Sequence, residues 1–245
     1  MIEFKEVSFQ YSSERKVIDH VSFHIEKGES VGLIGANGAG KSTVMKLLLG
    51  LLEGEGEIRI SDIPVNRKNL SAIRKICGFV LQNADDQMFM PTVYEDMIFG
   101  PRNYGLSKEE TEKKIDEILR LLDIQDLKHR YNHKLSGGEK RMTAIATVLA
   151  MEPQILLMDE PTAALDPYNR RMVINIINKL PQTKIITSHD LDMILDTCDR
   201  VILLGNGKIV ADGKCQDILS NQKLLEENRL ELPLSFMYQK EKELL

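Results

Sequence analysis

Tryptophan is absent from this sequence of 245 residues, and aromatic residues together make up only 5% of it. Cysteine is almost as scarce. The three cysteines, Cys77, Cys198 and Cys215, are an odd number and lack the spacing of a metal site. They predict reduced, structural side chains in a reducing compartment rather than a disulfide framework.

Long apolar runs are also missing. Stretches such as Ile155–Met158 and Val201–Leu204 fall far below the ~18 residues that a membrane-spanning helix needs. Glu3, Lys5 and Glu6 interrupt the N-terminus, where a secretory signal would be apolar. We therefore expect a chain that does not cross the membrane and stays in the cytoplasm.

The sequence also lacks an excess of positive charge. The 32 lysines and arginines are outnumbered by 37 aspartates and glutamates, giving a formal net charge of −5 and a pI near 5.7. Such a chain has no overall positive field to hold nucleic acid or anionic lipid by electrostatics alone. The charge balance therefore argues against a generic nucleic-acid binder.

The sequence does contain enough apolar residues, 42%, to bury a core. In the first 30 residues, Val21, Phe23 and Ile25 alternate with polar residues, which predicts antiparallel strands. Farther along, strands alternate with helices, which predicts a parallel sheet. We expect strands at 31–34, 57–60, 76–81, 155–158, 184–187 and 201–204, a last strand through 210, and helices at 43–49, about 107–122, from 136, and 167–180.

A phosphate-loop pattern follows the strand at 31–34 and precedes a helix, which is the context this motif requires. Its glycines let backbone N–H groups curl around phosphates, and the helix N-terminus adds a positive dipole. Lys41 can reach the outer phosphates and Ser42 can ligate Mg²⁺. The alternative is a glycine turn that merely starts a helix. The residues concerned are Gly35, Ala36, Asn37, Gly38, Ala39, Gly40, Lys41, Ser42 and Thr43.

Two acidic residues, Asp159 and Glu160, stand at the carboxyl end of the apolar strand 155–158. In α/β proteins, ligands bind at this end of the strands. Asp159 can hold Mg²⁺ through its water shell, and Glu160 can accept a proton from the water that attacks a γ-phosphate. A solvated turn is the alternative for such a pair taken alone.

A second anion site is predicted where Ser136, Gly137, Gly138 and Glu139 open a helix with a hydroxyl and two glycines. In isolation this segment could also be a plain N-cap. Together with the phosphate loop, it gives one chain two loops able to bind phosphate.

These motifs, with Ala164-Leu165-Asp166 and Ser188-His189-Asp190 after them, resemble the ABC ATPase family in content and order, over nearly the whole chain up to about Gly213. The resemblance implies an α/β P-loop NTPase core with a mainly parallel sheet, an N-terminal antiparallel β-subdomain and a helical signature subdomain. Within a single domain at 1–245, we expect the core at 1–83 and 152–213, the helical subdomain at 84–151, and a C-terminal helix and tail at 214–245.

The resemblance also implies roles for single residues. Gln82 matches the Q-loop glutamine that senses Mg²⁺ and the attacking water, and His189 matches the switch histidine near the γ-phosphate. Asp166 matches the D-loop aspartate, and Tyr11 the aromatic residue that stacks on adenine. Taken alone, His189 and Tyr11 would be ordinary structural and packing residues.

The same resemblance implies ATP and Mg²⁺ as ligands and a head-to-tail dimer, because the signature loop Ser136–Glu139 contacts the ATP held by a second subunit. That subunit is an identical copy or a paralogue. The chain would act on the cytoplasmic face of the cell membrane with a transmembrane coupling subunit and a substrate-binding membrane subunit.

Within the family, the run Gln82-Asn83-Ala84-Asp85-Asp86-Gln87 resembles energy-coupling-factor transporters, although Ala84 stands where that group usually has proline. Other segments, such as Phe99-Gly100-Pro101, look most like the cobalt and nickel branch; import of B vitamins is the alternative. The scattered histidines and cysteines form no cluster of soft ligands, so a transported metal ion should bind a membrane subunit.

A non-transport ABC ATPase of DNA repair or translation is the alternative to a transporter subunit. Such a protein would carry long coiled-coil insertions or tandem cassettes, for which the motif spacing leaves no room.

Four apolar residues near Gln82 have two possible placements. They could form a docking surface for the membrane partner or occupy ordinary core positions. These residues are Met88, Phe89, Met90 and Met97.

Overall fold

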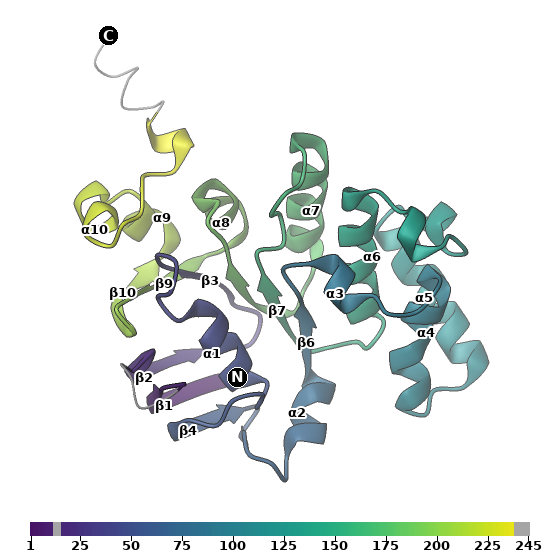
Figure 1. The fold of residues 1–245 in the computed structure, drawn as a ribbon, viewed down its shortest axis with the longest axis horizontal. Coiled ribbons are helices and arrows are strands. Elements are labelled where there is room, and N and C mark those ends of the chain that lie inside the picture. The colour runs from purple at the N-terminus through teal and green to yellow at the C-terminus, as the bar shows by residue number, and fades with distance from the viewer. Residues whose placement is uncertain (12–15, 238–245) are drawn as a thin grey trace. The chain divides into compact units, whose positions relative to one another are not determined.

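The structure is a computed structural model that describes residues 1–11 and 16–237. The chain divides into two compact units (Figure 1). Unit 1 comprises Met1–Arg74 and Pro181–Leu245, and unit 2 comprises Lys75–Leu180. Part of the predicted C-terminal tail, at 238–245, lies outside the described residues.

Unit 1 contains an antiparallel sheet with the strand order β2-β1-β4-β5. Phe4 pairs with Phe23 across the first two strands, and their rings stack with centroids 4.5 Å apart. The strands are β1 (Ile2–Phe9), β2 (Ile18–Ile25), β4 (Glu55–Ile60) and β5 (Ile63–Pro64). Antiparallel pairing of the first strands, predicted from their alternating pattern, is confirmed.

Unit 1 also contains the strands β3 (Ser30–Ile34), β8 (Thr183–Thr187), β9 (Arg200–Gly205) and β10 (Lys208–Lys214). β3 lies between β8 and β9 and is parallel to both, whereas β10 returns antiparallel to β9. β3 and β8 are buried along their whole length, as strands inside a parallel sheet are, although β8 includes Thr183, Lys184 and Thr187. The last strand continues four residues beyond its predicted end at 210.

The helices of unit 1 are α1 (Lys41–Leu48), α8 (Leu191–Thr197), α9 (Cys215–Leu219) and α10 (Gln222–Glu227); α2 (Leu70–Ile76) leads into unit 2. α1 begins two residues before its predicted start, because Gly40 occupies the N-cap position. Sequence periodicity did not predict α2. The predicted polar C-terminal helix is a pair of short helices, α9 and α10, which follow β10 (Figure 1).

Unit 2 pairs β6 (Cys77–Val80) in parallel with β7 (Ile155–Asp159). Its helices are α3 (Ala84–Gln87), α4 (Val93–Asn103), α5 (Lys108–Leu121), α6 (Gly137–Leu149) and α7 (Pro167–Lys179), with single turns at Gln125–Leu127 and Asn132–Lys134. α4, α5 and α6 lie together in Figure 1. The helix predicted from about 107 is α5, and a capping box formed by Ser107 and Glu110 is present at its start.

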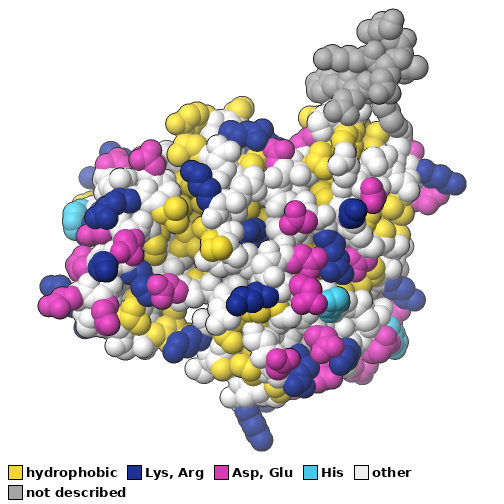
Figure 2. Space-filling view, turned by 180° about the vertical axis from the view of Figure 1, so that it is seen from behind, with side chains coloured by type: hydrophobic (Ala, Val, Ile, Leu, Met, Phe, Trp, Pro, Cys, Tyr) yellow, Lys and Arg dark blue, Asp and Glu magenta, His cyan; other side chains and the backbone are white. Residues whose placement is uncertain are grey.

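The predicted fold class is confirmed: the chain combines an antiparallel sheet with a mixed sheet whose pairings are mostly parallel. In the described part of the chain, no helix has the length and apolar character needed to span a membrane. Figure 2 shows acidic and basic side chains interspersed on one face, as the small net charge suggests.

Candidate nucleotide site

The phosphate loop of unit 1 has the backbone that its glycines predict. Gly35, Gly38 and Gly40 have φ values of 149°, 78° and 108°, in the region that side chains disfavour. A Cβ on Gly35 would lie 2.4 Å from the carbonyl oxygen of Leu204, which is backbone and cannot move aside. Gly38 has open space around it. The loop therefore has both the curvature and the clearance for phosphate oxygens to approach its N–H groups.

Lys41, the first residue of α1, points back into this loop. Its side chain is buried, and Nζ donates hydrogen bonds to the carbonyl oxygens of Gly35 at 2.6 Å and Ala36 at 3.3 Å. The ammonium group is thus held against two carbonyl oxygens at the start of the loop. Ser42 next to it is exposed, so its hydroxyl is accessible to a metal ion.

Tyr11 lies beside the same helix. Its hydroxyl is 3.2 Å from Oγ1 of Thr43, and its ring meets that of Phe9 edge-on at 4.8 Å. The side chain nevertheless remains 59% exposed. A ring anchored at both its edge and its hydroxyl but open on its face suits stacking on a base.

A cavity of about 470 Å³ adjoins the tip of the phosphate loop within unit 1. Its walls include Asn37 and Gly38, the β9–β10 turn around Asn206, and the end of α10 at Asn228 and Arg229. Sequence analysis did not predict that the C-terminal segment reaches the phosphate loop, because no motif marks a contact between residues so far apart.

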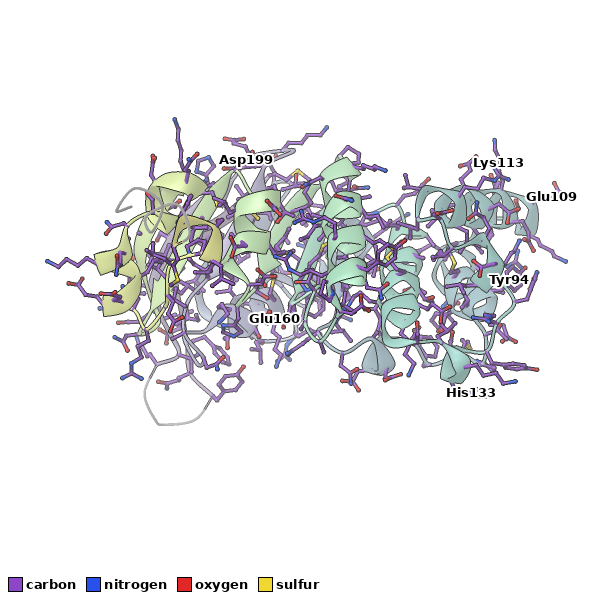
Figure 3. All side chains as sticks on the ribbon, turned by 90° about the horizontal axis from the view of Figure 1, so that it is seen from above. Tyr94, Glu109, Lys113, His133, Glu160 and Asp199 are labelled. Carbon is purple, nitrogen blue, oxygen red and sulfur yellow. The ribbon has the colours of Figure 1, made fainter. Side chains whose placement is uncertain are left out.

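In unit 2, Asp159 ends β7 and Glu160 follows it (Figure 3). Glu160 is only 8% exposed and has a φ of 49°, an unusual left-handed conformation for a residue other than glycine. Such local strain persists where the surrounding structure fixes it, and it is common at functional sites.

The signature loop, residues 136–139, opens α6 with a capping box. The N–H of Ser136 donates to Oε2 of Glu139 at 2.7 Å, and the N–H of Glu139 donates to Oγ of Ser136 at 3.3 Å. The backbone hydrogen bond from Ser136 holds the pKa of Glu139 below its usual value. Arg130 adds an ion pair to the same carboxylate at 3.0 Å. Ser136 and Gly137 are exposed, so the N–H end of the helix is open to a ligand.

Asp166 caps α7 by accepting hydrogen bonds from the N–H groups of Tyr168 and Asn169, both at 3.0 Å. The Asn169 side chain donates to the same carboxylate, and it also lies against Gly138 of the signature loop. The bond from the Asn169 N–H is the main reason that the pKa of Asp166 is lowered. Asp166 and the signature loop are therefore neighbours through Asn169.

Gln82 and His189 are both exposed. Gln82 follows β6, and its carbonyl oxygen accepts a hydrogen bond from Arg141 of α6. His189 stands between β8 and α8, where the next residue, Asp190, caps α8 by accepting from the N–H of Met193 at 3.0 Å.

The predicted residues thus fall into two groups. Unit 1 carries Tyr11, the phosphate loop and His189, and unit 2 carries Gln82, the signature loop, Asp159, Glu160 and Asp166. Sequence analysis did not predict the contacts of Arg141, Gln87 and Asn169, whose side chains hold the Q-loop and the D-loop to α6. The only sequence signal for Arg141 is its place on the helix that the signature loop opens.

Comparison with known proteins decides the family. The ABC transporter family profile matches residues 18–163, more than half of the chain. This chain belongs to the ABC transporter family. A putative ABC transporter ATP-binding protein of Geobacter sulfurreducens is 46% identical over 236 residues, covering 96% of this chain and 95% of that protein.

Other relatives narrow the comparison. An energy-coupling factor transporter ATP-binding protein, EcfA, of Carboxydothermus hydrogenoformans is 41% identical over 95% of this chain and 87% of its own length. The structure of cbiO1 from Clostridium perfringens, part of the ABC transporter complex cbiONQ, has a TM-score of 0.84 at 32% identity and covers 98% of both chains.

A dimeric ATP-binding cassette solved after hydrolysis, with ADP and Pi bound, has a TM-score of 0.78 at 28% identity and covers 88% of this chain and 99% of its own. Binding of ATP and Mg²⁺, ATP hydrolysis and dimerisation are general properties of ABC ATPases. The chain is accordingly an ATPase.

The residues present fit a magnesium triphosphate. The loop presents N–H groups around Gly38, where no atom would crowd a Cβ, and a buried ammonium group at its start. The hydroxyl of Ser42, in the same unit as the loop, is a hard oxygen donor of the kind that Mg²⁺ prefers. Among the described residues, no cluster of histidine, cysteine and acidic side chains offers a separate metal site.

Proposed function

We propose that this ABC ATPase powers an energy-coupling-factor importer from the cytoplasmic face of the membrane, with cobalt or nickel ions as the transported substrate. The Gln82–Gln87 run supports the importer type, as do the EcfA relatives and the cbiO1 structure. The cobalt and nickel branch rests on the sequence resemblance alone, and import of a B vitamin is the alternative.

We propose these site roles. Lys41 and the N–H groups of the phosphate loop hold the β- and γ-phosphates, and Tyr11 stacks on adenine. Ser42, Asp159 and Gln82 hold Mg²⁺, which neutralises phosphate charge when it is bound. Ser136, Gly137, Gly138 and Glu139 present the open end of α6 to the nucleotide of the second subunit, and Asp166 links the two sites. We also propose that residues 84–151 form the helical subdomain that carries the signature loop.

Glu160 orients the attacking water and accepts its proton, while His189 contacts the γ-phosphate side of the site. The single observation that carries the catalytic assignment is that Glu160, directly after Asp159, is nearly buried and has a left-handed backbone conformation. Burial excludes bulk water from the group that must take the proton, and the fixed backbone limits its orientations.

Glu160→Gln tests this role, because glutamine keeps the shape of the side chain but cannot accept the proton. We expect nucleotide binding to be retained, turnover to fall by about 10²-fold or more, and ATP to trap a dimer that gel filtration detects. Glu109→Gln is the matched control, since Glu109 is exposed on the first turn of α5 (Figure 3). Turnover of Glu160→Gln at the rate of this control would contradict the assignment.

The docking site of the membrane partner is proposed at the aromatic pair Phe89 and Phe99. Their rings meet edge-on at 4.8 Å although the side chains are 63% and 42% exposed. Exposed neighbouring aromatics are typical of protein contacts. Met97 is wholly buried, so this residue belongs to the core and not to the docking surface.

Phe89→Asp should abolish co-purification with membrane subunits from native membranes and leave the ATPase activity of the isolated chain within about twofold, because the change is confined to an exposed position. Retained co-purification would contradict the docking site, and chromosomal rather than membrane partners would contradict the transporter assignment. Uptake of labelled cobalt, nickel and vitamins by the assembled complex identifies the substrate.

A further inference from the structure

A buried guanidinium group connects the signature helix to the Q-loop. Arg141, on the second turn of α6, is only 4% exposed. Its Nη1 donates a hydrogen bond to the carbonyl oxygen of Leu81 at 2.6 Å, and its Nη2 donates to the carbonyl oxygen of Gln82. Both acceptors belong to the backbone that carries the Gln82 side chain.

A second side chain holds the same backbone from its other side. Oε1 of Gln87 accepts a hydrogen bond from the N–H of Leu81 at 3.0 Å. Nε2 of Gln87 donates to the carbonyl oxygen of Ala144 at 2.6 Å and to Oγ1 of Thr147 at 3.0 Å, both on α6. The N–H of Leu81 is thus tied to α6 through Gln87, and its C=O directly by Arg141.

The charge of Arg141 is costly at this place. No carboxylate among the residues that the structure describes forms an ion pair with it, its Nε has no hydrogen-bond partner there, and burial lowers the pKa of the guanidinium group. Burying a charge without a counterion is unfavourable, and a well-packed apolar side chain would serve stability as well or better. We therefore look for the benefit of Arg141 in the two hydrogen bonds that its guanidinium group donates to Q-loop carbonyl oxygens.

We propose that Arg141, together with Gln87, is a positioning residue that fixes the Q-loop backbone to the signature helix, so that Gln82 and Ser136 move together. α6 rises about 1.5 Å per residue, so the guanidinium lies within two turns of the cap at Ser136. A helix of this length is stiff, and a shift at either end is transmitted along its axis. The inference rests on the proposed role of Gln82 in holding Mg²⁺.

The consequence is measurable in the Mg²⁺ dependence of ATP hydrolysis by the full-length chain. Arg141→Lys leaves a single donor group that cannot reach both carbonyls in the fork geometry of arginine. We expect the Mg²⁺ concentration for half-maximal activity to rise about tenfold, as for the loss of one charge-assisted hydrogen bond. The KM for ATP at saturating Mg²⁺ should change less than about threefold, because the phosphate loop is not altered.

Lys140→Ala is the matched control. Lys140 is the preceding cation on α6, and its ion pair with Asp85 at 2.6 Å involves an exposed carboxylate rather than the Q-loop backbone. We expect its Mg²⁺ midpoint to stay within about twofold of the unchanged protein, since exposed ion pairs contribute little. A general structural effect of changing α6 would move both variants alike.

Gln82→Ala serves as the reference for the role on which the inference rests. If Gln82→Ala leaves the Mg²⁺ midpoint unchanged, the proposed metal role of Gln82 is wrong. If Gln82→Ala raises the midpoint and a folded Arg141→Lys does not, the positioning role of Arg141 is wrong.

Gln87→Met keeps the test decisive should Arg141→Lys fail to fold. It removes the hydrogen bonds to Leu81 and Ala144 while keeping a side chain of similar length, and it leaves Arg141 in place. We expect a smaller rise of the midpoint, about threefold, for the loss of neutral hydrogen bonds. An unchanged midpoint in this folded variant would overturn the inference.

Discussion

Replacing Gly138 with alanine tests how tightly the signature loop packs against the start of α7. A Cβ at this position would lie 2.4 Å from both Cγ and Oδ1 of Asn169, well inside van der Waals contact. The amide of Asn169 also donates to the carboxylate of Asp166, so it cannot swing aside without breaking that hydrogen bond. The substitution therefore disturbs the signature loop and the D-loop together.

The expected cost follows from three contributions. Overpacking a filled site costs about 1–3 kcal/mol, and loss of the hydrogen bond from Asn169 to Asp166 adds about 1 kcal/mol, since the pair is partly exposed. The higher helix propensity of alanine offsets up to about 1 kcal/mol. A net destabilisation of about 1–4 kcal/mol lowers the Tm of a chain of this size by roughly 2–16 °C.

Gly137→Ala is the matched control, because a Cβ on Gly137 would meet no atom within 4 Å. There only the propensity gain acts, and the Tm should stay equal or rise slightly. Thermal unfolding of the nucleotide-free chains, followed by circular dichroism, compares the two substitutions. Equal melting temperatures for both variants would refute the packing of Asn169 against Gly138 described above.

Three further predictions concern Lys41, Glu139 and the three cysteine thiols. Lys41→Ala should weaken nucleotide binding by about 10- to 100-fold, because a charged hydrogen-bond donor is lost. A titration with a fluorescent nucleotide measures this change, and an unchanged affinity would count against the proposed phosphate contact of Lys41. The pKa of Glu139 is lowered from 4.5, so its stabilisation is present above that pH and lost as the pH falls through the lowered pKa. Glu139→Gln should therefore lower the Tm at neutral pH, and the difference should shrink near pH 3; a constant difference would be inconsistent with this linkage. Burial raises the pKa of the thiols of Cys77, Cys198 and Cys215 to about 12, about 11 and about 12, respectively. A thiol reagent at mildly alkaline pH should therefore label these cysteines only after unfolding, and rapid labelling of the native chain would contradict this prediction.

Features whose cause is local were readable from the sequence. The phosphate loop follows from glycine conformation at fixed spacing, and the helix starts at Ser107 and Ser136 follow from capping residues three positions apart. The strands 31–34 and 155–158 were predicted because an apolar run between turn signals has few other stable conformations. The motif order then indicated the family, which the comparisons confirm.

Features that depend on which elements meet were decided only by the tertiary structure. Met97 and Phe89 are both apolar and lie near Gln82, yet one is wholly buried and the other is exposed. A helical period tells which residues share a face but not what covers that face. The contacts of Arg141 with Leu81 and Gln82 join residues about 60 positions apart, and such pairs arise from packing rather than from any local pattern.

The sequence by itself determined the conformation of the glycine-rich loop at 35–40 and the capped start of α6, because these depend on residues adjacent along the chain. The fold decided which backbone Arg141 holds, how Asn169 joins Asp166 to the signature loop, and which aromatic side chains stay at the surface. Those outcomes depend on volume, burial and hydrogen-bond geometry among distant segments, which exist only once the chain has folded.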